Sequence, residues 1–245
     1  MPLKSFFLNL LFPLECLACH QEGSWLCASC FQKLKFNDTN KKYNLFTPNI
    51  TKVFIAGDYD DPLLATLIKK FKYNFNSSLG PTLALFLIDF WKKIINEQGL
   101  IDKKGLINNK DSINGKNPIN GQFNFLMAPA SSFLIIPIPL SKKRRRWRGF
   151  NQAEILAQNF EKTFNYTLNL QLKRNKHQKP QASLNENERA ENIKNAFVWS
   201  GDNLKDKNII LIDDVVTTGA TLNEAAKILK LAGANKIYAL VLAKG

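Results

Sequence analysis

Two neighbouring carboxylates, Asp213 and Asp214, end an apolar stretch of the chain and are followed by a small, hydroxyl-rich segment. That segment consists of Thr217, Thr218, Gly219, Ala220 and Thr221. Backbone N–H groups at the start of a helix, together with hydroxyl donors, can bind a phosphate without a lysine, and a glycine permits close approach. Carboxylates just before such a turn can accept hydrogen bonds from ribose hydroxyls or help to hold a divalent cation. The combination predicts a site for a phosphorylated sugar.

The segments around this site have the patterns of a strand and a helix. Residues 209–212 form an unbroken apolar run, which is typical of a strand buried on both faces of a parallel sheet. Apolar residues then recur at helical spacing over 220–232, with Gly233 at the expected C-terminus. Residues 217–221 are therefore predicted to turn from the strand into the positive end of a helix dipole. If the carboxylates only began a loop and the threonines only capped a helix, two adjacent acids after a wholly apolar strand would stay unexplained.

A second distinctive segment is strongly cationic. An apolar run over 133–140 leads into 142–148, which carries six positive charges in seven residues. We expect a cationic loop beside the crevice, followed by a helix that begins near Asn151, and such a loop can neutralise a pyrophosphate. A nucleic-acid or membrane contact with Trp147 as its aromatic element is the alternative, and the two roles can coexist. The candidate pyrophosphate contacts are Leu140, Ser141, Lys142 and Arg148.

All four cysteines lie in one short stretch, as two Cys-x-x-Cys pairs with seven residues between them. Each pair can direct two thiolates to one point, and two pairs complete a tetrahedral zinc site. Two disulfides are the alternative; they suit an exported protein, and the apolar stretch 6–14 lacks the small-residue cleavage site of a signal peptide. With sulfur in every position, the zinc is expected to be structural. The predicted ligands are Cys16, Cys19, Cys27 and Cys30.

Composition suits an α/β protein with anionic partners. The 245 residues, 45% of them hydrophobic, are enough for one α/β domain with a small appendage. The net charge of +14 and the pI near 9.6 predict a polyanion as partner, whether a pyrophosphate, a nucleic acid or an acidic membrane surface. No segment reaches membrane-spanning length, so we expect no membrane span and a cytoplasmic protein.

Hydrophobic periodicity outlines an alternation of strands and helices. We expect strands near 53–57, 133–138, 209–213 and 236–242, and helices near 61–73, 80–97, 150–165 and 220–232. This order predicts an α/β fold with a mainly parallel sheet flanked by helices. The low-complexity segment 97–122 has no sustained period, and we interpret it as a flexible insertion. Residues 173–197 fit either a flap over the substrate or an ordinary surface loop.

Segment 209–222 resembles the 5-phosphoribosyl 1-pyrophosphate (PRPP) binding signature of type I phosphoribosyltransferases. Together with three further features, in the same order along the chain, it resembles the ComF family. Those features are the double Cys-x-x-Cys, Arg148-Gly149-Phe150-Asn151-Gln152-Ala153-Glu154 after a Pro-x-Pro strand, and Gln181-x-x-Leu184-x-x-x-x-Arg189-x-x-Asn192-x-x-x-Ala196-Phe197. Residues 69–73 are also similar to that family's lysine-tyrosine segment.

The resemblance implies a type I phosphoribosyltransferase fold with an N-terminal zinc-binding module, in proteins associated with natural competence and DNA uptake. It implies further that Mg²⁺-bound PRPP places its ribose hydroxyls at Asp213 and Asp214, the candidate catalytic residues, and its 5′-phosphate on 217–221. The pyrophosphate would then extend toward 140–143 and the basic loop. On this basis we expect a zinc-binding module and connector over 1–47 and a phosphoribosyltransferase domain over 48–245.

Our leading hypothesis is a phosphoribosyltransferase, a glycosyltransferase that transfers a pentosyl group, with Mg²⁺ and structural zinc as cofactors and an unassigned acceptor. The alternative is a DNA-binding competence factor with a regulatory or inactive PRPP pocket. Its partners would be single-stranded DNA and other competence proteins. The synthase half of a glutamine amidotransferase fits poorly, because all four cysteines are paired for metal.

Overall fold

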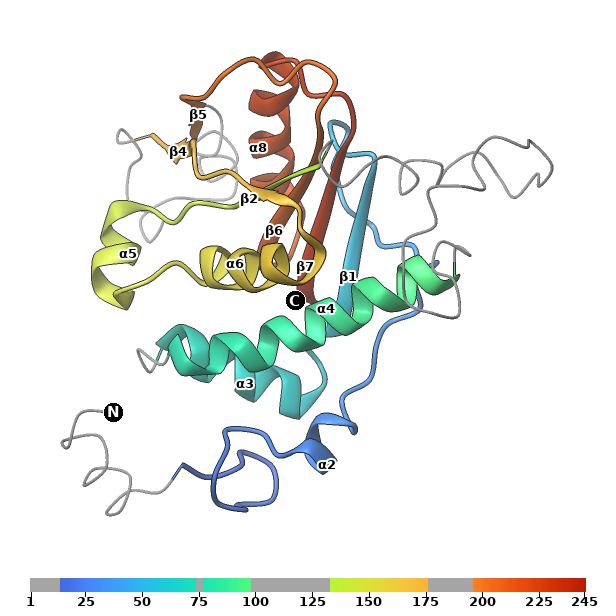
Figure 1. Ribbon diagram of the computed structural model, residues 1–245, viewed down its shortest axis with the longest axis vertical. Coiled ribbons are helices and arrows are strands. Elements are labelled where there is room, and N and C mark those ends of the chain that lie inside the picture. Colours follow the sequence, from blue (N-terminus) through green and yellow to red (C-terminus); the bar gives the residue numbers. More distant parts are fainter. Residues whose placement is uncertain (1–13, 74–76, 98–132, 176–195) are drawn as a thin grey trace.

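The computed structural model describes residues 14–73, 77–97, 133–175 and 196–245, and in these ranges it forms one parallel sheet covered by helices (Figure 1). The strand order is β1-β7-β6-β2-β3, and every neighbouring pair is parallel. A separate antiparallel ribbon joins β4 and β5. The strands are β1 (Lys52–Asp58), β2 (Phe133–Pro137), β3 (Thr167–Leu168), β4 (Leu172–Arg174), β5 (Phe197–Trp199), β6 (Asn208–Val216) and β7 (Ile237–Lys244). The helices are α2 (Ala28–Phe31), α3 (Pro62–Tyr73), α4 (Gly80–Glu97), α5 (Lys142–Arg148), α6 (Gln152–Phe164) and α8 (Ala220–Leu231), with a 3₁₀ turn η1 (Ser77–Leu79).

The predicted α/β fold is confirmed, and the central strands show why. β6 is buried from Asn208 to Ile212, and β7 is buried over its first seven residues, because each lies between two other strands with helices over both faces. Continuous apolar runs are the sequence signature of strands in that position. The remaining predicted strands and helices occur within a few residues of their expected ranges.

Two hydrophobic layers cover the two faces of the sheet. One contains residues of α3, α4 and α6 together with Ile210 and Ile212 of β6. The other contains residues of α8 together with Ile209 and Leu211. This alternation follows from the two-residue period of a strand. Figure 1 accordingly shows α8 on one side of the strands and α3, α4 and α6 on the other.

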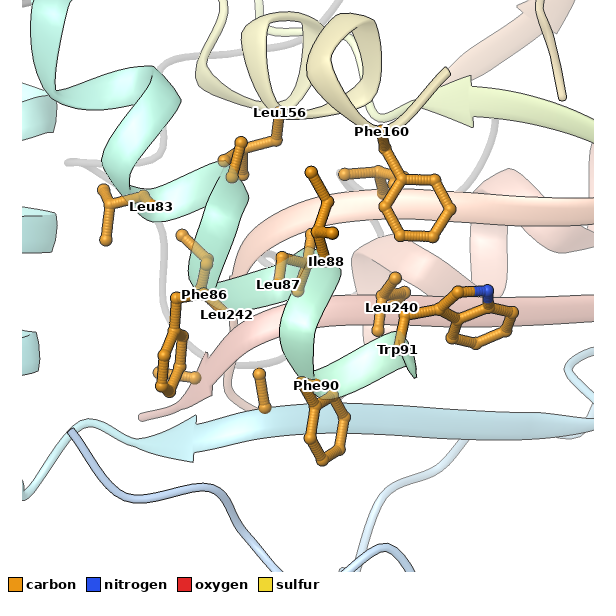
Figure 2. Packing of buried hydrophobic residues seen from close by; sticks show 14 of the residues in the cluster. Leu83, Phe86, Leu87, Ile88, Phe90, Trp91, Leu156, Phe160, Leu240 and Leu242 are labelled. Carbon is orange, nitrogen blue, oxygen red and sulfur yellow. The ribbon is translucent and has the colours of Figure 1, made fainter. Parts of the chain in front are cut away.

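Helix α4 supplies much of the first layer. Figure 2 shows Leu87, Ile88 and Trp91 lying between the α6 side chains Leu156 and Phe160 and the sheet. The Trp91 ring meets that of Phe160 at 5.8 Å between centroids. Charged side chains interrupt the opposite face of α4. Among the described residues, no helix combines the length and the apolar character that a bilayer crossing requires.

The cysteine-containing segment packs on this same layer. Cys16 and Cys30 are buried in one hydrophobic cluster with residues of α3 and α4. The indole N–H of Trp25 donates to Ser78 Oγ at 2.6 Å, and the Phe36 ring lies 4.8 Å from that of Phe86 on α4. The segment therefore shares part of its apolar core with the sheet domain. The predicted division between 1–47 and 48–245 stays a prediction.

Two other predictions concern segments that lie mostly outside the described residues. Apart from Glu97, the last residue of α4, the predicted insertion at 97–122 falls in the range 98–132. The predicted flap or loop at 173–197 is described only at its two ends, where β4 and β5 pair.

Candidate functional site

The predicted phosphate turn joins β6 to α8. Thr217 and Thr218 are exposed, and α8 begins at Ala220, one residue after Gly219. Gly219 has a φ of +86°, a left-handed conformation that favours glycine. The Ala220 N–H donates weakly to Thr218 Oγ1, at 3.4 Å. The first N–H groups of a helix have no partner within the helix. The turn therefore offers backbone N–H donors and the positive end of the α8 dipole.

A connector strap, which we define as residues 43–49, lies against this turn. The Phe46 N–H donates to the Thr218 carbonyl at 3.3 Å, and the Asn49 N–H donates to Asn223 Oδ1 in the first turn of α8 at 3.0 Å. A Cβ on Gly219 would lie 2.7 Å from Thr47 Cγ2. The strap thus contacts the turn directly and limits the space beside Gly219. No periodicity or motif in the sequence indicated this contact.

The acidic pair lies within β6 rather than after it, because the strand continues to Val216. Asp214 is 9% exposed, and its Oδ1 accepts from the Val215 N–H at 2.7 Å. Asp213 Oδ1 accepts from the Asp214 N–H at 2.9 Å. Since successive side chains of a strand point to opposite faces, the two carboxylates have different neighbours.

Those neighbours set the charge of each carboxylate. Lys72 Nζ at the end of α3 forms an ion pair with Asp214 Oδ1 at 3.2 Å. Burial, and then the negative charge of Asp214, raise the pKa of Asp213 to about 7, although the Asp214 N–H, Lys72 and Arg174 oppose the rise. The raised pKa allows the neutral form of the Asp213 carboxyl to persist near neutral pH, and a neutral carboxyl can donate as well as accept a hydrogen bond.

The prediction of a basic loop was wrong, because the segment forms helix α5. Ser141 caps the helix by accepting from the Arg144 N–H at 3.3 Å, and Gly149 ends it with a φ of +78°. Lysine and arginine are good helix formers, so a run of them between a cap and a glycine folds locally. The predicted helix after Asn151 is confirmed as α6, which begins at Gln152.

The predicted pyrophosphate contacts occupy different environments. Leu140 and Ser141 lie three and four residues after the end of β2, which pairs with β6. The Ile138 N–H, directly after β2, donates to the Ile212 carbonyl at 2.9 Å. This pairing brings the end of β2 beside the acidic pair. Lys142 is exposed on α5, whereas Arg148 is buried at 7% exposure.

Arg148 points into the protein. Its NH1 donates to Gln152 Oε1 at 2.9 Å, and its guanidinium lies 5.4 Å from the centre of the Tyr73 ring. Arg148 Nε and Gln152 Nε2 are buried and have no hydrogen-bond partner among the residues that the structure describes. No specific role was predicted for Lys72, Tyr73 or Gln152; the only signal for them in the sequence is that each lies in a segment that resembles the ComF family.

The four cysteines converge as predicted. Their sulfur atoms all lie within 4.8 Å of one another, and Cys19 Sγ is 3.6 Å from Cys27 Sγ. Tetrahedral zinc with Zn–S bonds of about 2.3 Å would separate the sulfurs by about 3.8 Å. A disulfide needs about 2 Å, and all four thiols are free. The cluster can therefore hold a metal ion such as zinc.

The clustered thiols also influence one another's ionisation. Burial raises the pKa of Cys16, but hydrogen bonds, chiefly from the Cys27, Ala18 and Cys19 backbone N–H groups, outweigh it and lower the pKa to about 6. Contact with the Cys27 side chain, and then burial, raise the pKa of Cys30 to about 12. Negative charge that one thiolate gains opposes ionisation of the next, and a divalent cation would remove that conflict.

Part of the chain matches a known family of protein domains. A family model described as phosphoribosyl transferase domain matches residues 147–245, which include β6, the phosphate turn and α8. Competence protein F of Haemophilus influenzae is 40% identical over 113 residues, which cover 45% of this chain and 49% of that protein. Competence protein ComFC of Bacillus subtilis is 39% identical over 101 residues, or 41% of this chain and 40% of that protein.

A similar relative carries a different name. DNA utilization protein YhgH of Escherichia coli O157:H7 is 32% identical over 111 residues, which cover 45% of this chain and 48% of that protein. The chain thus spans about half the length of the curated relatives it matches.

Gly219→Ala should weaken phosphate binding, because the substitution strains a left-handed residue and places a Cβ against Thr47. We expect a loss of unfolding free energy of about 1–2 kcal/mol and a lower affinity for ribose 5-phosphate, measured by denaturant titration and calorimetry. Gly233→Ala is the control, since its φ of +101° carries similar strain far from the turn. Equal affinity in the two variants would contradict the assignment of the turn.

Proposed function

Because the chain belongs to the ComF family, we propose that it binds PRPP with Mg²⁺ and acts as a phosphoribosyltransferase. The turn between β6 and α8 is the observation that carries the proposal. It combines exposed hydroxyls, a left-handed glycine and a helix N-terminus directly after two carboxylates. The match of residues 147–245 to a phosphoribosyl transferase domain supports it, since that range contains the whole turn.

The proposed orientation of the substrate follows from the order of charges along the sheet edge. The 5′-phosphate would bind 217–221, and the ribose hydroxyls would bind Asp213 and Asp214. The pyrophosphate would extend toward Leu140, Ser141 and Lys142 and the exposed cations of α5. Arg148 would have to leave Gln152 to reach it, because its guanidinium points into the protein.

The chemistry of the transfer suits these residues. Displacement at C1 of the ribose releases pyrophosphate, so most of the catalytic contribution would come from holding the sugar and neutralising the leaving group. Mg²⁺ would arrive with the substrate and supply further positive charge at the pyrophosphate. The acceptor would enter from the opposite side of C1.

We place this activity in a competence-associated role in the cytoplasm. Two relatives, whose aligned regions cover about half of their own length, carry the names competence protein F and competence protein ComFC. Four free cysteines suit a compartment in which thiols stay reduced.

Asp213→Asn/Asp214→Asn should abolish most PRPP binding while the domain stays folded. Hydrogen bonds to charged groups contribute about 1.5–3 kcal/mol each, so we expect the affinity for Mg²⁺-PRPP to fall at least tenfold in calorimetry. Asp202→Asn/Asp206→Asn removes the same charge from exposed positions and should bind as the wild type does. PRPP binding that survives in the first variant, with an unchanged circular dichroism spectrum, would refute the proposed site.

We also propose that the cysteine cluster binds one structural zinc ion. The sulfur separations suit tetrahedral coordination, and Cys16 and Cys30 are part of the hydrophobic cluster that includes α3 and α4. With four sulfur ligands the ion has no open position for substrate, so its contribution would be to stability.

Elemental analysis should find one zinc per chain, and a strong chelator should lower the melting temperature. Cys19→Ser removes one ligand and should reduce the zinc content. Ser29→Ala is its control, because the Ser29 hydroxyl contacts Cys27 Sγ at 3.2 Å without being one of the four clustered ligands. Two disulfides in non-reducing mass spectrometry, without zinc, would contradict the site.

A second candidate function is binding of single-stranded DNA, with the PRPP pocket regulatory or inactive. The observation that favours it is an aromatic pair beside α5. The Tyr73 and Trp147 rings lie 5.9 Å apart, and about half of each side chain is exposed. Residues 142–146 add five exposed cations to the same surface. Stacked bases and neutralised phosphates are the two contributions that single-strand binding requires.

Lys142→Ala/Lys143→Ala and, separately, Trp147→Ala should weaken binding of an oligothymidine. The charge variant should also reduce the salt dependence of the affinity, because fewer counterions are released. Lys227→Ala/Lys236→Ala removes equal charge from exposed positions elsewhere and serves as control. Fluorescence anisotropy at several salt concentrations measures both effects, and equal affinity in all variants would exclude this surface.

A further inference from the structure

Helix α3 delivers a lysine to the acidic pair. Lys72 Nζ lies 3.2 Å from Asp214 Oδ1, and only 15% of the lysine and 12% of the aspartate side chain are exposed. The ion pairs Lys41–Asp58 and Lys92–Asp89 leave 38–48% of each side chain exposed. Removing two charges from water to this degree is costly, and a buried pair often adds no stability over apolar packing. Its value then lies in holding the charges at defined positions.

The contacts of Asp214 are concentrated on one oxygen. Oδ1 accepts both the Lys72 ammonium and the Val215 N–H, at 3.2 and 2.7 Å. Two donors on the same oxygen fix the rotation of the carboxylate. Oδ2 then has a defined direction and keeps its acceptor capacity for a ligand.

Lys72 is itself held in place by its two chain neighbours. The Phe71 ring lies 5.4 Å from that of Phe150, and the Tyr73 ring lies 5.9 Å from that of Trp147. Phe71 is fully buried. These contacts anchor the last turn of α3 to the end of α5 and to the short segment that follows it. The lysine therefore approaches Asp214 from a fixed backbone position.

We infer that Lys72 is a positioning residue for recognition of the ribose: it holds Oδ1 of Asp214 so that Oδ2 accepts a hydrogen bond from a sugar hydroxyl. This inference rests on the proposed PRPP site. A carboxylate oriented in this way disfavours a sugar that lacks the hydroxyl. Binding of such a sugar would leave Oδ2 of Asp214 poorly solvated and without a hydrogen-bond donor. Without Lys72, the carboxylate can rotate and this discrimination weakens.

The test compares ribose 5-phosphate with 2-deoxyribose and 3-deoxyribose 5-phosphate by calorimetry. For the wild type, the deoxy sugar that lacks the bonded hydroxyl should bind about 10- to 100-fold more weakly. The discrimination ratio is the affinity for ribose 5-phosphate divided by the affinity for that deoxy sugar. Lys72→Met should reduce this ratio to within about twofold of one, whereas Lys72→Arg, which keeps a cationic donor, should retain part of the discrimination. Lys69→Met removes the same charge from an exposed position of α3 and should leave the ratio unchanged.

The outcomes separate the inference from the function on which it rests. If the wild type binds neither PRPP nor ribose 5-phosphate, the proposed function fails, and the inference fails with it. If the wild type discriminates and Lys72→Met discriminates equally well, only the inference is overturned. A purely structural lysine would lower the affinity for all three sugars and leave their ratios unchanged. Should Lys72→Met fail to fold, Lys72→Gln keeps a donor without charge and is judged by the same ratio.

Discussion

The parallel pairing of β6 with both β2 and β7 is the constraint on which the site depends. Parallel strands end at the same edge of a sheet, so this pairing brings the acidic pair of β6 beside the segment that follows β2. The segment that leads from β2 into α5 and the turn from β6 into α8 therefore leave the sheet at the same edge, although about 70 residues separate them in the chain. Burial of β6 between two strands and two helical layers keeps that edge in place.

Sequence patterns predicted the structure correctly where the structure of a segment depends on its own residues. The apolar run at 209–212 and the helical spacing over 220–232 predicted β6 and α8, and the cysteine spacing predicted the cluster of sulfurs. The prediction of a loop for the basic segment was wrong because it rested on charge and left out the capping residues on either side. Ser141 before it and Gly149 after it are the cap and the stop of a short helix.

Contacts between distant segments could not be predicted in this way. Lys72 meets Asp214 across more than 140 residues, and Phe46 meets Thr218 across more than 170. Neither contact has a characteristic residue pattern, because each depends on how α3 and the strap pack against the sheet. Asp213 and Asp214 were identified as a pair, but their different environments follow from the alternation of β6 side chains between two layers.

Those environments explain how two carboxylates could adjoin the proposed phosphate site. Full negative charge on both would repel an incoming phosphate and would be costly at the end of an apolar strand. The two residues reduce this charge differently. Burial and the neighbouring carboxylate raise the pKa of Asp213 to about 7, so its neutral form persists to higher pH than for an ordinary aspartate, whereas Asp214 is compensated by the ammonium of Lys72. The two carboxylates can therefore offer oxygen acceptors to a sugar while they carry less than two full negative charges. In the proposed site, the N–H donors of the turn and the cations of α5 would then supply the positive charge that a bound phosphate requires.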